Sequence, residues 1–545
     1  MSRVVPTARL ALLLALLAPV FAWTGSDPEL PRLRVDTAYV PPVGRTIAVA
    51  AGGNFPAALK RAQPGDVITL EAGATFTGNF TLPAKTGSGW IIIRTSAPDS
   101  SLPAPDSRIT PAYACVLPKI VSPNSSPALT IAPGAHHYRF IGVEFTVAAD
   151  VPAIQNLLGN RAPASPAEVA HDLVFDRVYV HGNPRVNLRR AFALNSAATA
   201  IINSYVSEIH EVGADSQAIA SWSGPGPFKI VNNYLEAAGE NVLFGGADPP
   251  IQDLVPSDIE IRGNHFFKPL TWRIEDPSYA GTPWTVKNLF ELKNARRVLV
   301  DGNLFEHNWV HGQGGTAIVL TVRNQDGAAP WSVVEDVTFT NNIVRHTGTG
   351  IGMHNRDGNF PSQPTKRILI RNNLFVDVNG VRWGGLGHFF GAFGGIEDLV
   401  IEHNTALQGG SIVYVHGGSF IRFVYRHNIA PHNEYGIHGT GSAPGNHTLA
   451  MYVPGGVVEK NVIIGNPYPL QYPPNNFNPP SLAAVGFVNQ AAGDYRLSGS
   501  SRYKRAGSDG QDIGVDFEAL TAAMTAASAP ETGRDPCGRT GTGGK

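Results

Sequence analysis

The residues best suited to do chemistry gather between Asn264 and Asn342. The basic side chains in this window are Lys268, Arg273, Lys287, Lys293, Arg296, Arg297 and Arg323. The acidic ones include Glu275, Asp276, Glu291, Asp301, Glu306 and Asp326, and the tryptophans are Trp272, Trp284, Trp309 and Trp331. Aromatic faces beside cations suit a sugar acid, whose ring has an apolar face and an anionic edge. The alternative is a solvated surface over core tryptophans.

One short strand pattern within this window sharpens the prediction. In LFELK, apolar and polar residues alternate, so Glu291 and Lys293 are expected to face outward together. One repeat later, in AIVLTVRN, Arg323 faces outward if Val319 and Val322 are core. A carboxylate, a lysine and an arginine on adjacent coils would form a compact polar site. The alternative is an outward ion-pair ladder, which adds little stability.

The element that must position these residues is a repeat marked by asparagine. Strands of alternating apolar residues are each followed by an asparagine, at Asn203, Asn233, Asn264, Asn303, Asn342, Asn373, Asn404, Asn428 and Asn461. The spacings run from 24 to 39 residues, which is the range of solenoid repeats. Asparagine tolerates the left-handed conformation of a tight turn, and stacked asparagines can bond to one another as a ladder.

The repeat predicts an all-β, right-handed parallel β-helix with one coil per repeat. A propeller is disfavoured, because it needs four antiparallel strands per blade and a longer period. The two 39-residue repeats between Asn264 and Asn342 must carry long loops, and loops on a rigid scaffold are where sites are built. An apolar stripe in FPAALKRA, from Phe55 to Ala62, predicts a short amphipathic helix that caps the N-terminal end.

The predicted organisation has five segments. They are a signal peptide at 1–22, a linker at 23–45, the N-terminal cap and first coils at 46–127, the parallel β-helix at 128–516, and a short helix with a disordered tail at 517–545. The last coil is expected within 483–516, after a proline-rich excursion at 466–481. Within the coils we expect Val300, Phe339, Ile370 and Ile401 to stack in one inward column, because each precedes its asparagine by three residues.

The composition and the two ends of the chain limit which functions are possible. A net charge of −1 argues against a general nucleic-acid binder. Arg3 and Arg9 precede an 11-residue apolar run, which is typical of a secretory signal and too short to span a bilayer, although an N-terminal anchor is the alternative. We expect a secreted protein, extracellular or periplasmic, and a monomer. Export permits a Cys115–Cys537 disulfide, with two free thiols as the alternative.

Over residues 130–500 the strand and turn pattern resembles the pectin-lyase-like superfamily of right-handed β-helices. The segment from Lys293 (KNARRVLVDGNLF), followed by GTAIVLTVR, is similar to alginate and chondroitin lyases. That resemblance implies that Lys293 is the catalytic base and Arg323 the acid or carboxylate neutraliser, with Glu291 near the family's calcium carboxylates. Arg323 is followed by Asn324 and Gln325 rather than by the family's His-Gly.

A second resemblance, to pectate lyases, rests on FKIVNNYLEAAGENVLFGG at 228–246. It implies calcium as a cofactor, with Asp215, Glu236 and Glu240 as ligands, and Arg273 as the base. The polygalacturonase branch is disfavoured, because it uses an adjacent aspartate pair and this sequence has none.

The function expected from these observations is cleavage of a uronate-containing polysaccharide by β-elimination. Lys293, Arg323 and Glu291 form the predicted catalytic set, and the predicted substrate-binding residues around it are Lys268, Arg273, His354, Arg356 and Trp309. The alternative is a non-catalytic exported β-helix that binds glycan or other cell-surface material. A β-helix alone does not decide between them, because function resides in the side chains placed on a fold.

Overall fold

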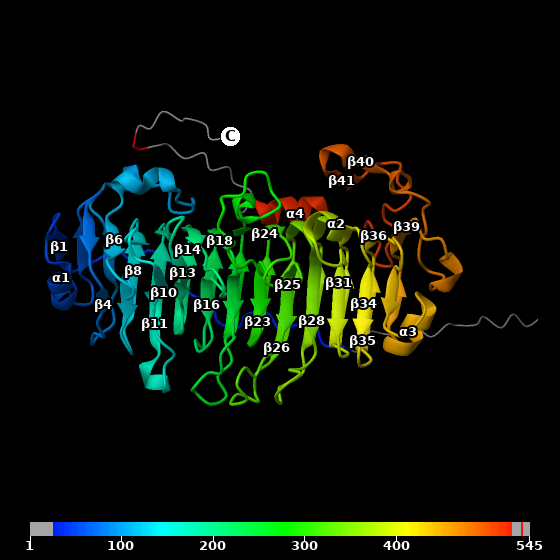
Figure 1. Cartoon of the computed structure of the whole chain (residues 1–545), viewed down its shortest axis with the longest axis horizontal. Coiled ribbons are helices and arrows are strands. Elements are labelled where there is room, and N and C mark those ends of the chain that lie inside the picture. The colour runs from blue at the N-terminus through cyan, green and yellow to red at the C-terminus, as the bar shows by residue number, and fades with distance from the viewer. Residues whose placement is uncertain (1–24, 526–535, 538–545) are drawn as a thin grey trace, which may run out of the picture.

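The computed structural model describes residues 25–525 and 536–537 of the 545-residue chain. The predicted signal peptide and most of the predicted tail lie outside these residues. Figure 1 shows an elongated stack of strands that runs from the N-terminal coil to the C-terminal one. Three long parallel sheets build it, and each coil contributes in turn to sheet A, sheet B and sheet C. This part of the chain is a right-handed parallel β-helix, as predicted.

The strands of the stack divide among the sheets as follows. Sheet A holds β1 (Thr46–Val49), β2 (Val67–Leu70), β5 (Ile91–Thr95), β8 (His136–Ile141), β11 (Ala170–Asp176), β14 (Ser196–Ile202), β17 (Phe228–Val231), β20 (Ser257–Arg262), β23 (Ala295–Asp301), β26 (Val334–Thr340), β29 (Lys366–Arg371), β32 (Glu397–Glu402), β35 (Ile421–Arg426) and β38 (Val457–Glu459). Sheet B holds β3 (Thr75–Thr77), β6 (Lys119–Ser122), β9 (Glu144–Val147), β12 (Tyr179–His181), β15 (Tyr205–Ile209), β18 (Tyr234–Ala237), β21 (His265–Phe267), β24 (Leu304–Asn308), β27 (Ile343–Thr347), β30 (Leu374–Val378), β33 (Thr405–Gln408), β36 (Ile429–Pro431) and β39 (Val462–Ile464). Sheet C holds β4 (Phe80–Leu82), β7 (Leu129–Ile131), β10 (Ala153–Gly159), β13 (Asn187–Ala193), β16 (Gln217–Ser221), β19 (Glu240–Phe244), β22 (Phe290–Leu292), β25 (Thr316–Thr321), β28 (Thr349–His354), β31 (Phe390–Phe393), β34 (Val413–His416) and β37 (Ile437–Gly439).

Helices are few and short. The α-helices are α1 (Phe55–Arg61), α2 (Gly380–Trp383), α3 (Asn446–Tyr452) and α4 (Phe517–Met524), and the 3-10 turns are η1 (Asp99–Ser101), η2 (Pro111–Val116), η3 (Pro166–Glu168), η4 (Leu270–Trp272), η5 (Pro469–Gln471), η6 (Leu482–Val485) and η7 (Gln490–Ala492). Helix α1 is the predicted N-terminal cap. Asn54 caps it by accepting from the Ala57 amide at 2.9 Å, and Phe55, Ala58 and Leu59 are buried against the first coils.

The predicted core column is confirmed. Val300 pairs with Phe339, Phe339 with Ile370 and Ile370 with Ile401 on successive strands of sheet A. All four side chains are at most 1% exposed. Because equal spacing from the asparagine places each residue at the same point of its coil, the repeat register read from the sequence is correct.

The predicted asparagine ladder is also confirmed. At each rung the backbone amide and the side-chain amide of one asparagine both donate to Oδ1 of the next, for example from Asn303 to Asn342 at 2.9 and 3.0 Å. The rungs are Asn233, Asn264, Asn303, Asn342, Asn373, Asn404, Asn428, Asn461 and Asn476. The first expected rung is displaced by one residue. Ser204 donates to Asn233, whereas Asn203 occupies the preceding left-handed position with φ of 55°.

The C-terminal part differs from the sequence-based expectation. No further coil forms over residues 483–516; instead β40 (Phe487–Asn489) pairs antiparallel with β41 (Asp494–Leu497). The reason is that the proline-rich excursion already completes the last coil, because Asn476 supplies the final ladder rung and Phe477 bridges Val462. The chain then turns back, and α4 packs on the outer face of sheet B against Leu304 and Leu374 (Figure 1).

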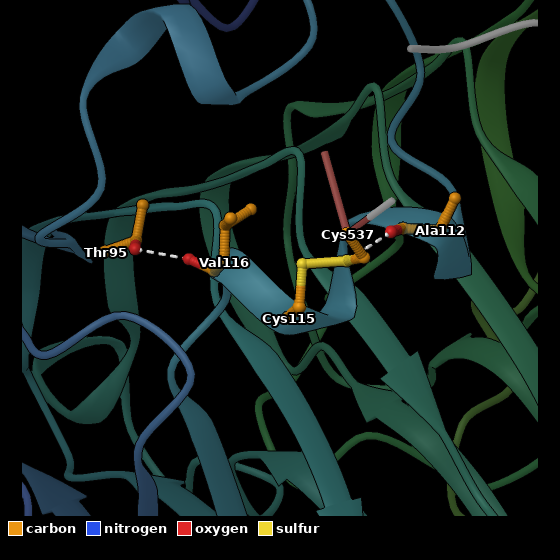
Figure 2. Close-up of a disulfide and its surroundings, with 5 residues drawn as sticks. All are labelled: Thr95, Ala112, Cys115, Val116 and Cys537. Carbon is orange, nitrogen blue, oxygen red and sulfur yellow. Dashed lines mark hydrogen bonds between the residues drawn. A yellow bond between two sulfur atoms is a disulfide. The ribbon is translucent and has the colours of Figure 1, made fainter. Parts of the chain in front are cut away.

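A disulfide fixes the far C-terminus near the first coils. Cys115 in η2 is bonded to Cys537, 422 residues later in the sequence, and the Cα atoms lie 5.9 Å apart (Figure 2). The two alternatives left open by the sequence are thereby decided. Within the described residues, no helix is both long and apolar enough to cross a membrane.

Candidate functional site

The polar residues expected to act together lie on the outer face of sheet C, in the middle of the stack. The predicted alternation in β22 is confirmed, since Phe290 and Leu292 belong to the core and pair with the core residues Val242 and Phe244 of β19. Glu291 and Lys293 therefore point to the opposite face. Glu240 begins β19 and pairs with Gln217 on β16, and its charge acts on both Glu291 and Lys293.

Glu240 is fully buried, and its carboxylate contacts one ammonium group and one side-chain amide. Lys287 Nζ lies 2.6 Å from Oε1 of Glu240, and Gln217 Nε2 donates to Oε2 at 2.8 Å. Burial alone would raise the pKa of Glu240, but the ammonium groups of Lys287 and Lys293 outweigh burial and lower it. The Glu240 side chain is therefore a carboxylate at neutral pH.

Glu291 has the opposite protonation behaviour, although it is on the neighbouring strand. It is 3% exposed, and burial together with the Glu240 charge raises its pKa to about 7, against the opposing effect of Lys293. Lys293 Nζ is 3.7 Å from Glu291 Oε1. Two neighbouring carboxyl groups whose pKa values are shifted in opposite directions are a common arrangement in acid–base sites.

Lys293 and Arg323 lie on adjacent coils. The Arg323 backbone amide donates to the Lys293 carbonyl oxygen at 2.8 Å. The Arg323 guanidinium is oriented by Asp357, whose Oδ1 is 3.2 Å from Nη1, and its side chain stays one-third exposed. The pKa of His354 is lowered, first by burial of its ring and second by the positive charge of the nearby Arg323.

Two of the residues predicted to bind substrate are placed elsewhere. Lys268 is 0% exposed, and its ammonium donates to the carbonyls of residues 237, 238 and 239 and to Asn241 Oδ1, at 2.6–3.1 Å. It stabilises a turn from inside, so its prediction as a surface contact is wrong. Trp309 is 2% exposed in a cluster with Trp272, Trp284 and Trp383, so it is a core residue.

The other three predicted binding residues are near the surface. Arg273 lies over the Trp383 ring at 4.8 Å and 3.5 Å from Glu275, away from sheet C's outer face. Arg356 donates to the Ser362 carbonyl at 2.6 Å and so stabilises its own loop. His354 ends β28 and stacks near Phe393 at 4.7 Å, within the outer face of sheet C.

The residues predicted to bind calcium do not fit that ion as a group. Lys287 Nζ lies 2.6 Å from Asp215 Oδ2 and 2.6 Å from Glu240 Oε1, so an ammonium already occupies the position between these two carboxylates. Glu236 is on β18 of sheet B, where it accepts from the Glu208 amide and from Tyr234 Oη. A buried ammonium and a divalent cation repel each other, so no step below depends on calcium.

An outward column of sheet C extends from the site toward the C-terminal coils. From Glu291 it continues over Val319, Gly352 and Gly391 to Tyr414, four coils away or about 19 Å at the usual strand spacing. The two glycines present no side chain there. The next outward column carries His354, Phe393 and His416, and Phe393 is 36% exposed.

Sequence reasoning missed several contributors to this face. Gln217 and Asp357 orient Glu240 and Arg323, and Arg190 lies over the Trp222 ring at 5.1 Å one coil earlier. Asp357 directly follows Arg356 in the GMHNRDG segment, so a wider reading of that segment could have found it. Gln217 had no signal in the sequence, because it acquires its partner only through the pairing of β16 with β19.

Comparison with known proteins gives likeness of fold only. No protein-family model and no curated protein matches this sequence. Among solved structures, the alginate lyase AlyGC of family PL6 is 15% identical with a TM-score of 0.44, over 87% of this chain and 58% of that one. The Dettilon tailspike protein is 12% identical with a TM-score of 0.38, over 77% of this chain and 63% of that one. Pectate lyase Pel9A is 12% identical with a TM-score of 0.23, over 86% of this chain and 96% of that one.

This chain thus spans 58% and 63% of the length of the first two proteins. The expected resemblance to pectin-lyase-like β-helices is confirmed as a likeness of fold. At these identities and TM-scores it assigns no activity to this chain.

Proposed function

We propose that this protein is a secreted polysaccharide lyase that cleaves a uronate-containing polymer by β-elimination. The observation that carries the proposal is the contact of Lys293 with the buried Glu291, whose pKa is raised by burial and by Glu240, one coil from the partly exposed guanidinium of Arg323. Buried acid–base groups whose pKa values are pushed apart on an outer face are typical of catalytic centres.

The chemistry requires a base and a positive group at fixed positions. The base removes the proton on the carbon next to the uronate carboxylate, the electron pair left behind forms a double bond as the glycosidic C–O bond breaks, and the departing oxygen takes a proton from the protonated base or from water. Lys293 is the proposed proton acceptor. Arg323 pairs with the substrate carboxylate and stabilises the charge that develops there, while Asp357 holds its guanidinium in position.

Glu291 and Glu240 have supporting roles in this scheme. With a pKa of about 7, Glu291 exchanges its proton in the working range of most enzymes, so it can relay the proton that Lys293 collects. Glu240 remains ionised against Lys287, which keeps Lys287 charged.

The outer columns of sheet C suit an extended polymer beside these groups. Gly352 and Gly391 leave room over the strands, and Tyr414 and Phe393 offer aromatic surfaces for sugar rings. We place the polymer along the column from Tyr414 to Glu291, with the cleaved bond at Lys293. The Cys115–Cys537 disulfide fits export, because such bonds persist in oxidising compartments.

The test is a substrate screen of the purified protein against pectate, alginate and glycosaminoglycans, followed by the ultraviolet absorbance of the conjugated product. A rise with one polymer, absent in Lys293→Ala, supports the proposal. If no polymer gives the unsaturated product while one binds and Tyr414→Ala weakens that binding, the non-catalytic glycan-binding alternative holds instead. That alternative is favoured by the exposed aromatic residues alone.

A further inference from the structure

A second cluster of polar side chains lies outside the candidate site. It consists of His403, directly after β32, His427, directly after β35, and Asp509. His403 and His427 each directly precede a ladder asparagine, on neighbouring coils, and both adopt the left-handed conformation, with φ of 53° and 57°. This conformation turns both imidazoles outward. Asp509, from the segment that follows the β40–β41 hairpin, meets them there.

Three ligand-type atoms converge at this point. His403 Nε2 lies 2.8 Å from Asp509 Oδ2 and 2.9 Å from His427 Nδ1, and His427 Nδ1 lies 3.6 Å from Asp509 Oδ2. The circle through the three atoms has a radius of about 1.8 Å, so a point about 0.9 Å above their plane is about 2.05 Å from each, which matches zinc–nitrogen and zinc–oxygen distances.

The hydrogen bonds around this trio are compatible with a bound cation. The Ser508 amide donates to His427 Nε2 at 3.0 Å, and that contact requires an unprotonated Nε2 and a proton on Nδ1. If His427 Nδ1 then donates to His403 Nε2, the latter faces the Asp509 carboxylate as a second acceptor at 2.8 Å. With a metal ion on Nδ1, Nε2–H of His427 would donate to Ser508 Oγ at 2.8 Å in place of its contact with the Ser508 amide, as the second nitrogen of a metal-bound histidine usually does.

The surroundings complete the site. His427 is 1% exposed, so its imidazole is enclosed by the protein. A cavity of about 890 Å³ lies beside the trio, with His403 and Asp509 in its wall, and leaves a further coordination position accessible from outside. Two imidazoles and one carboxylate form a donor set suited to zinc and similar first-row ions.

Two other histidine clusters within the described residues have simpler explanations. His137 and Asp172 occupy the column in which acidic and basic residues alternate, as Asp258 does with Arg297, and their side chains lie 3.8 Å apart as members of that series. Glu306, in the cluster with His307 and His346, is already paired with His265 and Arg345.

We propose that His403, His427 and Asp509 bind a divalent transition-metal ion of the zinc class, which fixes the C-terminal segment to the β-helix. The ion would add to the hydrogen bonds that hold the segment here, among them that from the Gly514 amide to the His427 carbonyl at 2.8 Å and that from the Val515 amide to Thr405 Oγ1 at 3.1 Å. The ion would join two consecutive coils to a residue 82 positions further along the chain from His427.

The experiment uses the full secreted chain, stripped of metal by a chelator and titrated with zinc chloride by calorimetry. We expect a site of one-to-one stoichiometry that His403→Gln and Asp509→Asn abolish and that Ser508→Ala weakens by about tenfold. His171→Gln is the matched control, because it alters a histidine cluster of the same composition elsewhere, and it should leave this site intact. Zinc should also slow proteolysis of residues 485–525 in the wild type and not in Asp509→Asn.

Anomalous diffraction at the zinc absorption edge locates the ion. A peak bounded by His403, His427 and Asp509 supports the proposal. The absence of stoichiometric binding, a peak only at His137 and His171, or equal binding in wild type and Asp509→Asn would each overturn it. None of these outcomes depends on lyase activity.

Discussion

The ammonium of Lys293 lies 3.7 Å from the carboxyl oxygen of Glu291, two residues earlier in the same segment. Because side chains two apart in a strand face the same side, this contact is set by local geometry. Its electrostatics are not local, since the raised pKa of Glu291 depends on burial and on Glu240 from the preceding coil. The following predictions begin from this pair.

Replacing Lys293 by alanine should abolish turnover of the cleaved polymer while the fold is retained, because loss of a general base typically costs about 10²–10⁴-fold in rate. Lys366→Ala is the matched control. Lys366 forms a comparable pair with Glu335 at 3.4 Å, but on sheet A. Initial rates and circular dichroism of both variants provide the measurement, and an active Lys293→Ala enzyme would remove this residue from the mechanism.

The free energy of unfolding should depend on pH through the protonation of Glu291. Its pKa is near 7 in the folded protein and about 4.5 in the unfolded chain, so the folded state binds the extra proton between these values. The stabilisation from the protonated form is thus present at low pH and declines as pH rises from about 4.5 through about 7. In Glu291→Gln, which keeps a neutral side chain, the decline over this window should be smaller. Urea unfolding at several pH values measures it, and identical curves for the two proteins would contradict the assignment.

Asn342 should be stabilising as an internal rung of the ladder. Its Oδ1 accepts from the Asn303 backbone and side chain, and its Nδ2 donates to the Val300 carbonyl and to Asn373 Oδ1, each at 2.9–3.0 Å. Asn342→Ala leaves these buried groups unpaired and should lower the free energy of unfolding by about 1–3 kcal/mol. The exposed Asn359→Ala is the control and should change it little. Equal melting temperatures for the two variants would count against the ladder's contribution.

Ile370 tests the inward column. Ile370→Ala removes a fully buried side chain between Phe339 and Ile401 and should cost about 2–5 kcal/mol. Ile421, which is 51% exposed on the same sheet, serves as the comparison, and its alanine variant should lose far less. Chemical denaturation of both proteins decides the point. A similar loss in both would mean that packing within the column is not what stabilises the coil.

The disulfide should stabilise the protein by limiting the unfolded chain. Cys537→Ser opens a cross-link between residues 422 apart and should lower the free energy of unfolding by about 2–5 kcal/mol. Cys115→Ser should have the same effect, and wild type in a reducing agent should match both variants (Figure 2). A wild-type melting temperature that is unchanged on reduction would show that the bond contributes nothing.

Much of the fold could be predicted from the sequence because the repeat is a local property. A strand of period two and an asparagine at a constant offset recur in each coil, and this constant offset was enough to place Val300, Phe339 and Ile370 in one column. The same reasoning gave the outward direction of Glu291 and Lys293. It failed by one residue at Asn203, because the backbone amide of Ser204 is the group that donates to Asn233 Oδ1.

The burial and the ionic partners of the site residues were decided only by the tertiary structure, because loops from distant parts of the chain meet there. Lysine is usually a surface residue, yet Lys268 is enclosed by the turn that joins β18 to β19. This turn and the strand ends beside it supply four oxygen atoms that accept hydrogen bonds from the Lys268 ammonium group. Lys287 lies between Asp215 and Glu240 only because the long loop after β21 returns to β19, which replaced an expected calcium site by an ammonium. Periodicity fixes the direction of a side chain relative to its own strand, whereas burial and ionic partners depend on what other segments bring to that face, and no pattern along the sequence encodes that.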